Sequence, residues 1–204
     1  LIVKDQGWLE DEGYDITWTQ SLGSSKANEA LRAGAIDFGS TAGSAALLAR
    51  ANGSPQQIIT IVAQPEWSAL VVPAGSDITE PADLKGKTIA AALGTDPYFF
   101  LVQALEENGL SVDDVTVENL LHPDGWAALQ SGSVDAWSGL DPIMATAEAS
   151  GAELLYRNLD FNSFSVLNAS EKIIDENPEA VQAVVDAYER ARVWALENPE
   201  KTAE

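Results

Sequence analysis

One stretch of this sequence occurs twice and limits the folds that the chain can adopt. Residues 30–41 return in altered form as residues 128–139, and both copies read Ala-Leu-x-x-Gly-x-(Ile/Val)-Asp with a serine three positions after the Asp. The Ala-Leu pair predicts the end of a helix, and the glycine suits the left-handed position that stops one. The β-branched residue then predicts a short buried strand, at 35–38 and at 133–137. Two such units predict two lobes of similar build. The alternative is chance, because helix–glycine–strand junctions are common in α/β proteins.

The rest of the sequence alternates in the same way between β-branched apolar runs and capped amphipathic segments. We expect further strands at residues 14–18, 58–62, 70–72, 88–92, 115–120, 154–156 and 164–167. We expect helices at residues 1–8, 24–31 (capped by Ser24 or Ser25), 42–51, 79–85, 95–108, 126–131 and 142–150, and from Pro178 onward with Asn177 as the cap. Alternating strands and helices predict parallel sheets whose strand-to-helix turns gather at the carboxyl edge, where ligands bind in such folds.

The predicted fold class is α/β with two lobes, each a mainly parallel sheet flanked by helices. Residues 1–71 and 166–204 are expected to form the first lobe, and residues 72–165 the second, because the alternation restarts after Pro73-Ala74-Gly75. The chain begins in what reads as the middle of a helix and ends just after a new helix start. We therefore expect the first strand of the first lobe to be missing and its C-terminal end to be cut.

Composition excludes several classes of function. The formal net charge is −21, so phosphate-rich nucleic acid and anionic membrane surfaces would be repelled. The chain has no cysteine and one histidine, His122, which excludes disulfides, thiol catalysis, zinc held by cysteine and a paired-histidine metal site. No apolar run approaches the ~20 residues that span a bilayer. We expect no metal and no cofactor.

Six turns are expected to line a cleft between the two lobes: 22–25, 40–44 and 64–68 from the first, and 94–97, 122–126 and 139–142 from the second. Nearly all of them open a helix, and helix N-termini bind anions through unpaired N–H groups. The turns contain no lysine or arginine, so an anion would be held by backbone amides and by neutral hydroxyls. The candidate donors are Ser40, Thr41, Ser44, Gly94 and Thr95. Hydrogen bonds of ~1.5–3 kcal/mol to a charged group, added over three or four contacts, reach the ~8 kcal/mol of a micromolar complex.

Aromatic residues in or beside the same turns could form an apolar wall, namely Trp67 with Pro65, Tyr98, Trp126 and Trp137. Each of them could equally belong to the core. Asp141 could accept a hydrogen bond from a ligand or could cap its own helix. Catalysis has little support, since a Ser-His-Asp triad would need His122, and neither a Walker motif nor a Gly-x-Gly-x-x-Gly turn is present.

The order of these motifs resembles the substrate-binding proteins of ABC importers for aliphatic sulfonates, taurine and nitrate, with the alkanesulfonate branch nearest. The resemblance is carried by residues 34–39, by Leu84-Lys85-Gly86-Lys87, by 94–105, and most specifically by 132–137 followed by Asp141-Pro142. It implies a two-lobed periplasmic-binding-protein-like (type II) fold that closes on its ligand by hinge motion. It also places oxyanion donors at Ser40, Thr41 and the Gly94-Thr95 turn, with Trp137 and Asp141 facing the cleft.

What the resemblance implies about function is capture of a small anionic organic ligand for a membrane permease. The protein would be a monomer without enzymatic activity, periplasmic or extracellular, with a lipid anchor on a segment outside this chain as one option. Leu140 departs from the family, which often has a tryptophan before the Asp-Pro pair, so the pocket wall can differ. Which ligand is bound stays open between a sulfonate, taurine, nitrate and a heteroaromatic precursor.

Two alternatives use the same fold. One is an enzyme or sensor that binds a thiamine-precursor-like heteroaromatic, although the cysteine-rich motif of those enzymes is missing here. The other is the effector domain of a transcription regulator, which requires an upstream helix-turn-helix where an importer component requires an export signal.

Overall fold

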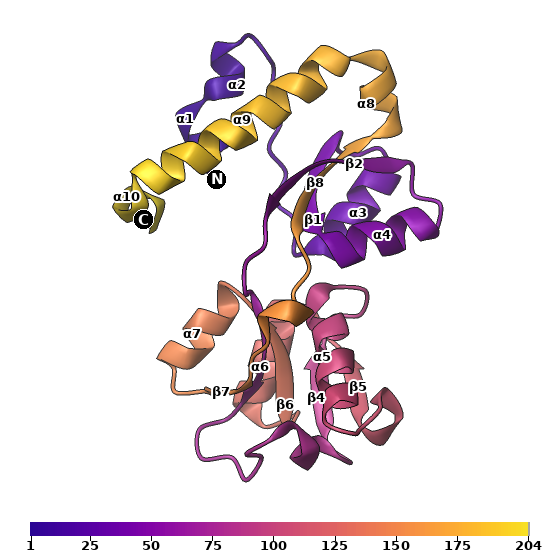
Figure 1. Ribbon diagram of the computed structural model, residues 1–204, viewed down its shortest axis with the longest axis vertical. Coiled ribbons are helices and arrows are strands. Elements are labelled where there is room, and N and C mark those ends of the chain that lie inside the picture. Colours follow the sequence, from indigo (N-terminus) through magenta and orange to yellow (C-terminus); the bar gives the residue numbers. More distant parts are fainter. Residues whose placement is uncertain (204) are drawn as a thin grey trace.

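The computed structural model describes residues 1–203 and contains two sheets, stacked along the long axis of the molecule and joined by two chain crossings (Figure 1). The first sheet has the order β1-β8-β2, with β1 Phe38–Ala42, β8 Ser165–Ser170 and β2 Gln56–Ala63. The second has the order β5-β4-β6-β3-β7, with β5 Thr116–Asn119, β4 Thr88–Ala91, β6 Ala136–Leu140, β3 Ser68–Val72 and β7 Glu153–Tyr156. We call the two halves the first lobe and the second lobe.

Helices surround both sheets. The first lobe carries α1 Ile2–Gln6, α2 Trp8–Asp11, α3 Ser24–Arg32, α4 Gly43–Ala51, α8 Glu171–Glu176, α9 Pro178–Glu197 and α10 Pro199–Ala203. The second carries α5 Asp96–Glu107, α6 His122–Ser131 and α7 Ile143–Ala149, together with the 3-10 turns η1 Pro81–Leu84, η2 Val112–Asp114 and η3 Leu159–Phe161. None of the helices within residues 1–203 is long and apolar enough to cross a membrane.

The strands that follow the crossings set the strand directions in each sheet. β3 pairs antiparallel with β6 and β7, and β8 pairs antiparallel with β1 and β2, because each enters its sheet from the other lobe. The parallel pairs are β4 with β5 and β4 with β6. The first sheet is therefore antiparallel and the second is mixed, so neither is mainly parallel as predicted. Since β3 belongs to the second sheet, the first crossing lies at residues 64–67, earlier than the predicted boundary at 71/72.

Both copies of the sequence repeat fold in the same way, as α3–β1–α4 and α6–β6–α7. Gly34 and Gly132 have φ values of 66° and 70°, which confirms the predicted left-handed helix stops. Each strand begins after the Asp rather than before it, three residues later than predicted. In the second copy the Asp135 carboxylate accepts a hydrogen bond from the Thr88 amide at 2.8 Å, so it serves to join strand ends.

Three local predictions were wrong. Residues 14–18 form no strand, because no strand lies beside them in the described chain. α3 has Gly23 as its N-cap, and Ser24 Oγ instead accepts from the Ala42 amide at 2.9 Å. α6 begins at His122 rather than at 126, since Pro123 suits the first turn of a helix. The Asn177 cap is confirmed by a 3.1 Å bond from the Ala180 amide to its side chain.

The second lobe has an apolar core on each face of its sheet, and this core holds α5 in place. Phe100 is fully buried on the α5 face and packs near Tyr156 and Phe161 at ring separations of 6.0 Å. Trp137 is 1% exposed on the opposite face, with Leu129 and Met144 in the same cluster. The core thereby fixes where α5 begins.

Replacing Phe100 by Ala should lower the free energy of unfolding by about 3–5 kcal/mol, because it removes a buried ring and leaves a cavity. Urea unfolding followed by circular dichroism measures this change. Val193→Ala is the control, since Val193 is 41% exposed and its loss should cost less than about 0.5 kcal/mol. Equal losses in the two variants would contradict the assigned core.

Candidate functional site

Helix starts from the two lobes meet at one place, which we call the seam. Gly23, before α3, lies against His122, the first residue of α6, so that a Cβ at Gly23 would be 3.1 Å from His122 Nε2. Ser44, in the first turn of α4, donates from its hydroxyl to Asp96, the first residue of α5. A Cβ at Gly94 would likewise meet the Leu48 side chain of α4 at 3.3 Å. Turns of both lobes therefore converge, and in this structure they touch.

Asp96 is the centre of the polar contacts at the seam. Asp96 is 2% exposed, and its carboxylate accepts from four groups. Trp67 Nε1 donates to Oδ2 at 2.8 Å, and the Ser163 amide donates to the same oxygen at 3.0 Å. The Ser163 hydroxyl lies 2.8 Å from both oxygens, and the Ser44 hydroxyl donates to Oδ1. One carboxylate thus joins the second lobe, both crossings and the first lobe.

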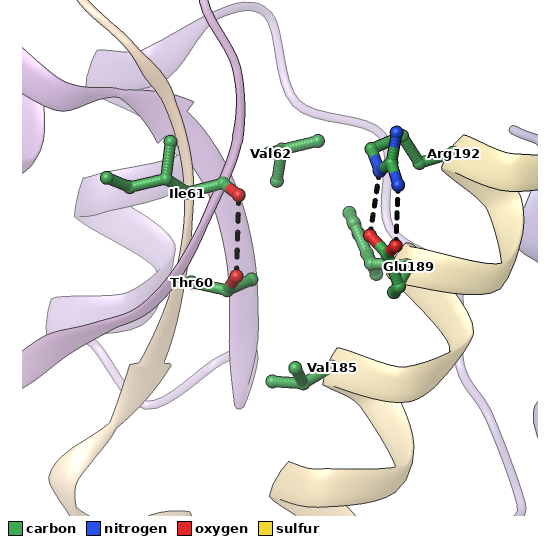
Figure 2. A pocket seen from close by; sticks show the side chains of 7 residues that line it. Thr60, Ile61, Val62, Val185, Glu189 and Arg192 are labelled. Atoms are coloured by element: carbon green, nitrogen blue, oxygen red, sulfur yellow. Dashed lines mark hydrogen bonds and ion pairs between the residues drawn. The ribbon is translucent and has the colours of Figure 1, made fainter.

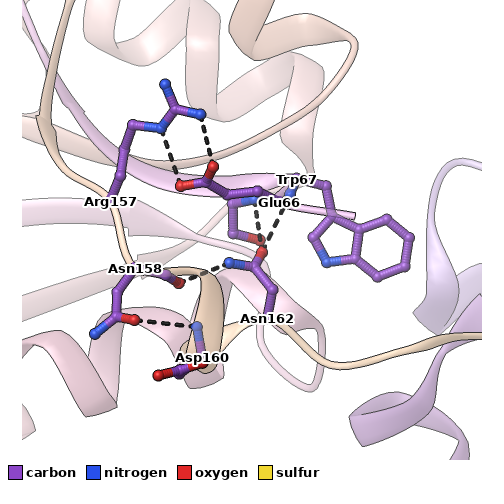
Figure 3. Close-up of polar contacts among 7 residues, drawn as sticks. Glu66, Trp67, Arg157, Asn158, Asp160 and Asn162 are labelled. Atoms are coloured by element: carbon purple, nitrogen blue, oxygen red, sulfur yellow. Dashed lines mark hydrogen bonds and ion pairs between the residues drawn. The ribbon is translucent and has the colours of Figure 1, made fainter. Parts of the chain in front are cut away.

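The two crossings are fastened to the second lobe by a separate set of polar contacts (Figure 3). Asn162 Oδ1 accepts from the amides of Trp67 and Ser68 at 3.2 and 2.9 Å, and its Nδ2 donates to the Asn158 carbonyl at 2.9 Å. Arg157 forms a bidentate pair with Glu66 at 3.1 and 2.8 Å. These contacts reach as far as Glu66 and Asn162, so they do not fasten residues 64–65 of the first crossing or residues 163–164 of the second.

His122 is buried at the seam, and its burial changes the pKa of the imidazole. Its side chain is 4% exposed, and Nδ1 finds no hydrogen-bond partner in the described part of the chain. Burial lowers the pKa of the imidazole below its ordinary value of 6.5, because the charged form loses its hydration. The neutral ring packs on Gly23, where even a methyl group would press against the imidazole.

Only some of the side chains that the sequence predicts as ligand donors lie at the seam. Ser44 and Trp67 come together at Asp96, as described above. Thr95 is buried and its hydroxyl donates to the Ala92 carbonyl at 2.6 Å, away from the seam contacts. The buried Thr41 hydroxyl accepts from Asn168 Nδ2 at 2.8 Å, while Ser40 is exposed on β1. Contact of any of these groups with a ligand stays a prediction.

The remaining candidates belong mainly to the second lobe. Trp137 is a core residue, and Trp126 is half-buried against it with ring centroids 6.1 Å apart. Asp141 is exposed and its carboxylate accepts from the Ala145 amide at 3.0 Å, so it caps the helix that follows. Tyr98 is half-buried in the first turn of α5, and Pro65 is half-buried in the first crossing. Of these five, Pro65 and Tyr98 lie nearest in sequence to the residues that meet at the seam.

A cavity of about 230 Å³ opens beside the seam, between α3 and α4. Leu93 and Gly94 close it from the second lobe, and Leu48 and Ser25 lie on the first-lobe side. A smaller hollow of about 40 Å³ lies between β2 and α9, beside the Glu189–Arg192 pair (Figure 2). That hollow is formed by the first lobe alone. Of these two cavities, the one at Gly94 involves both lobes.

Sequence reasoning missed the residues that hold the seam together. The sequence pattern placed Asp96 at a helix start, as one of two possible caps, and gave no prediction for Asn162 and Ser163. A buried aspartate at a helix start has the same sequence pattern as an exposed cap. The one available signal was the Asn-Ser pair directly before the returning strand, since both residues are strongly polar at a chain crossing.

Comparison with known proteins supports the sequence resemblance. The family model described as "NMT1/THI5 like" matches residues 1–202. A putative aliphatic sulfonates-binding protein of Bacillus subtilis (strain 168) is 30% identical over the whole chain and 64% of its own length. Its counterpart in Escherichia coli (strain K12) is 30% identical over 86% of the chain and 56% of its own length. The chain thus spans less than two thirds of the length of these relatives.

A solved structure confirms the fold. The alkanesulfonate-binding protein SsuA from Xanthomonas axonopodis pv. citri, bound to MOPS, superimposes with a TM-score of 0.85 at 26% identity. The match covers 99% of this chain and 74% of that one. The two-lobed periplasmic-binding-protein-like fold expected from the sequence is therefore shown.

Burial of neutral His122 predicts a pH dependence of stability. Because its pKa is lower in the folded than in the unfolded chain, the unfolded chain binds the proton first as the pH falls below about 6.5, and the folded state loses stability. The loss should approach ~1.4 kcal/mol per pH unit between pH 6.5 and the folded-state pKa. Urea unfolding at several pH values between 7.5 and 5.5 measures it.

His122→Gln is the control, because it removes the only histidine of the chain. Its stability should change less than that of the wild type across this range. The same slope in both proteins would show that other groups are responsible.

Proposed function

The chain belongs to the NMT1/THI5-like family, and from that premise we propose that it is the solute-binding component of an ABC importer. Its ligand would be a small organic oxyanion, most specifically an aliphatic sulfonate, held at the seam between the two lobes. The two relatives described above are named for binding aliphatic sulfonates, and the superimposed structure holds MOPS, itself a sulfonate.

The observation that carries this proposal is the meeting of helix starts from both lobes. A helix start presents N–H groups without partners and about half a positive charge, which favours an oxyanion. α3 and α4 from the first lobe face α6 and α5 from the second at this place. Four to six amide and hydroxyl bonds from these helices would supply micromolar affinity without a lysine or arginine, at ~1.5–3 kcal/mol each before the cost of binding.

Hinge closure would accompany binding. Because the crossings are fastened to the second lobe at Glu66 and Asn162, the first lobe would rotate about residues 64–65 and 163–164. The closed form would then be presented to a membrane permease. We propose that the protein acts without catalysis, as a monomer, in the periplasm or outside the cell.

Addition of an alkanesulfonate should raise the melting temperature. A ligand at 100 times its Kd adds ~2.7 kcal/mol of stability, which corresponds to about 5–10 °C for a chain of this size. Differential scanning fluorimetry with methanesulfonate, ethanesulfonate, taurine, nitrate and sulfate measures the response at constant ionic strength. The matched alkyl alcohols are the controls, since they lack the oxyanion. A shift with the heteroaromatic hydroxymethylpyrimidine and none with any sulfonate would overturn the sulfonate assignment.

A further inference from the structure

We propose that Ser44, Trp67 and Ser163 form a small-oxyanion site that Asp96 fills from within, and that this carboxylate holds the two lobes together without a ligand. The inference deepens the proposed function, because it concerns the part of the same seam that lies beside the two crossings. We call this part, around Asp96, the crossing end.

The groups that donate to Asp96 belong to three separate parts of the chain. Trp67 lies in the first crossing, Ser163 in the second, and Ser44 in the first lobe, while Asp96 itself belongs to the second lobe. An indole N–H, a backbone N–H and two hydroxyls surround the two oxygens. This donor set is neutral and convergent, as in sites that bind sulfate or carboxylate by hydrogen bonds alone.

The Asp96 carboxylate is buried, and no cation among the described residues pairs with it. It is 2% exposed, and the ion pairs found within residues 1–203 do not include it. A buried carboxylate without a counter-ion is costly unless hydrogen bonds replace its hydration shell. These hydrogen bonds therefore stabilise Asp96 strongly, and the same bonds are lost if the lobes separate.

Two bonds of Ser44 cross from the first lobe at this place. Its hydroxyl donates to Asp96, and its amide donates to Ser163 Oγ at 3.3 Å. Both depend on Asp96, because its carboxylate also orients the Ser163 hydroxyl. The start of α4 is thereby fixed to the second lobe through one acidic side chain.

It follows that Asp96 competes with an external oxyanion for the donors at the crossing end. The ligand's oxyanion would then have to occupy the other end, near Gly23 and His122, or displace Asp96. Removal of the carboxylate with retention of the donors should leave an empty site for a small anion of similar shape, such as acetate.

The experiment measures the distance between the lobes in Asp96→Ala. The chain has no cysteine, so spin labels at Ala51→Cys and Glu106→Cys, both exposed at the far ends of α4 and α5, report on it without interference. Double electron–electron resonance should show a longer and broader distance distribution in Asp96→Ala than in the labelled wild type. Addition of acetate should restore the wild-type distribution, and acetate should leave the wild type unchanged.

Asp114→Ala is the matched control, because Asp114 is a half-buried carboxylate away from the seam that accepts similar bonds from Ser111 at 2.9 Å. It should change neither the distance nor the response to acetate. Ser44→Ala is the second test variant and keeps Asp96 in place; it should lengthen the distance with no recovery in acetate.

Wild-type distances in both Asp96→Ala and Ser44→Ala would overturn the proposal and leave Asp96 as a helix cap. Longer distances that acetate does not restore in Asp96→Ala would overturn the oxyanion site. No sulfonate is used, so a wild type that binds no sulfonate would refute the proposed function and not this inference.

Discussion

A helix that begins inside a protein leaves amide groups that need acceptors, and this requirement governs the seam. Four helices begin where the two lobes meet, and water is largely excluded at Asp96 and His122. At one end, the Ser44 amide in the first turn of α4 donates to Ser163 Oγ, which in turn contacts the Asp96 carboxylate. At the other end, the neutral imidazole of His122 packs against Gly23. These contacts hold the two lobes in the arrangement that brings the helix starts together.

The hydrogen bonds of the two crossings decide where the lobes can move relative to each other. Asn162 and the Glu66–Arg157 pair make the crossings part of the second lobe, whereas the start of α4 in the first lobe is bonded through Ser44 to Ser163 and Asp96. Motion between the lobes is therefore expected to break bonds at the start of α4 before it disturbs either core. A ligand that offers oxygen atoms to these amides changes the balance between the closed and the separated forms.

Much of the fold could be predicted from local pattern, because glycine stops, proline starts and β-branched runs act within a few residues of the chain. Gly34, Gly132 and Asn177 took the predicted roles. The prediction of a strand at residues 14–18 was wrong, because a strand needs a neighbouring strand to pair with. No local sequence pattern shows whether such a neighbour is present. The direction of β3 and β8 was missed for a related reason, since it depends on the lobe from which each strand arrives.

The site was less predictable than the fold. The turns that meet at the seam could be identified, because the carboxyl edge of a sheet follows from the order of the elements. Their side-chain roles could not, since Thr95, Trp137 and Asp141 have local partners that compete with any ligand, and the burial of Asp96 depends on residues from three distant segments.

The central claim is that the seam binds an oxyanion through the helix starts of both lobes. A crystal structure of the protein grown with ethanesulfonate, with the sulfur located by anomalous scattering, tests it most directly. The account predicts a sulfur peak between α3 and α6, with sulfonate oxygens within hydrogen-bond distance of amides from both lobes. A peak in the groove between β2 and α9, or on one lobe alone, would contradict it.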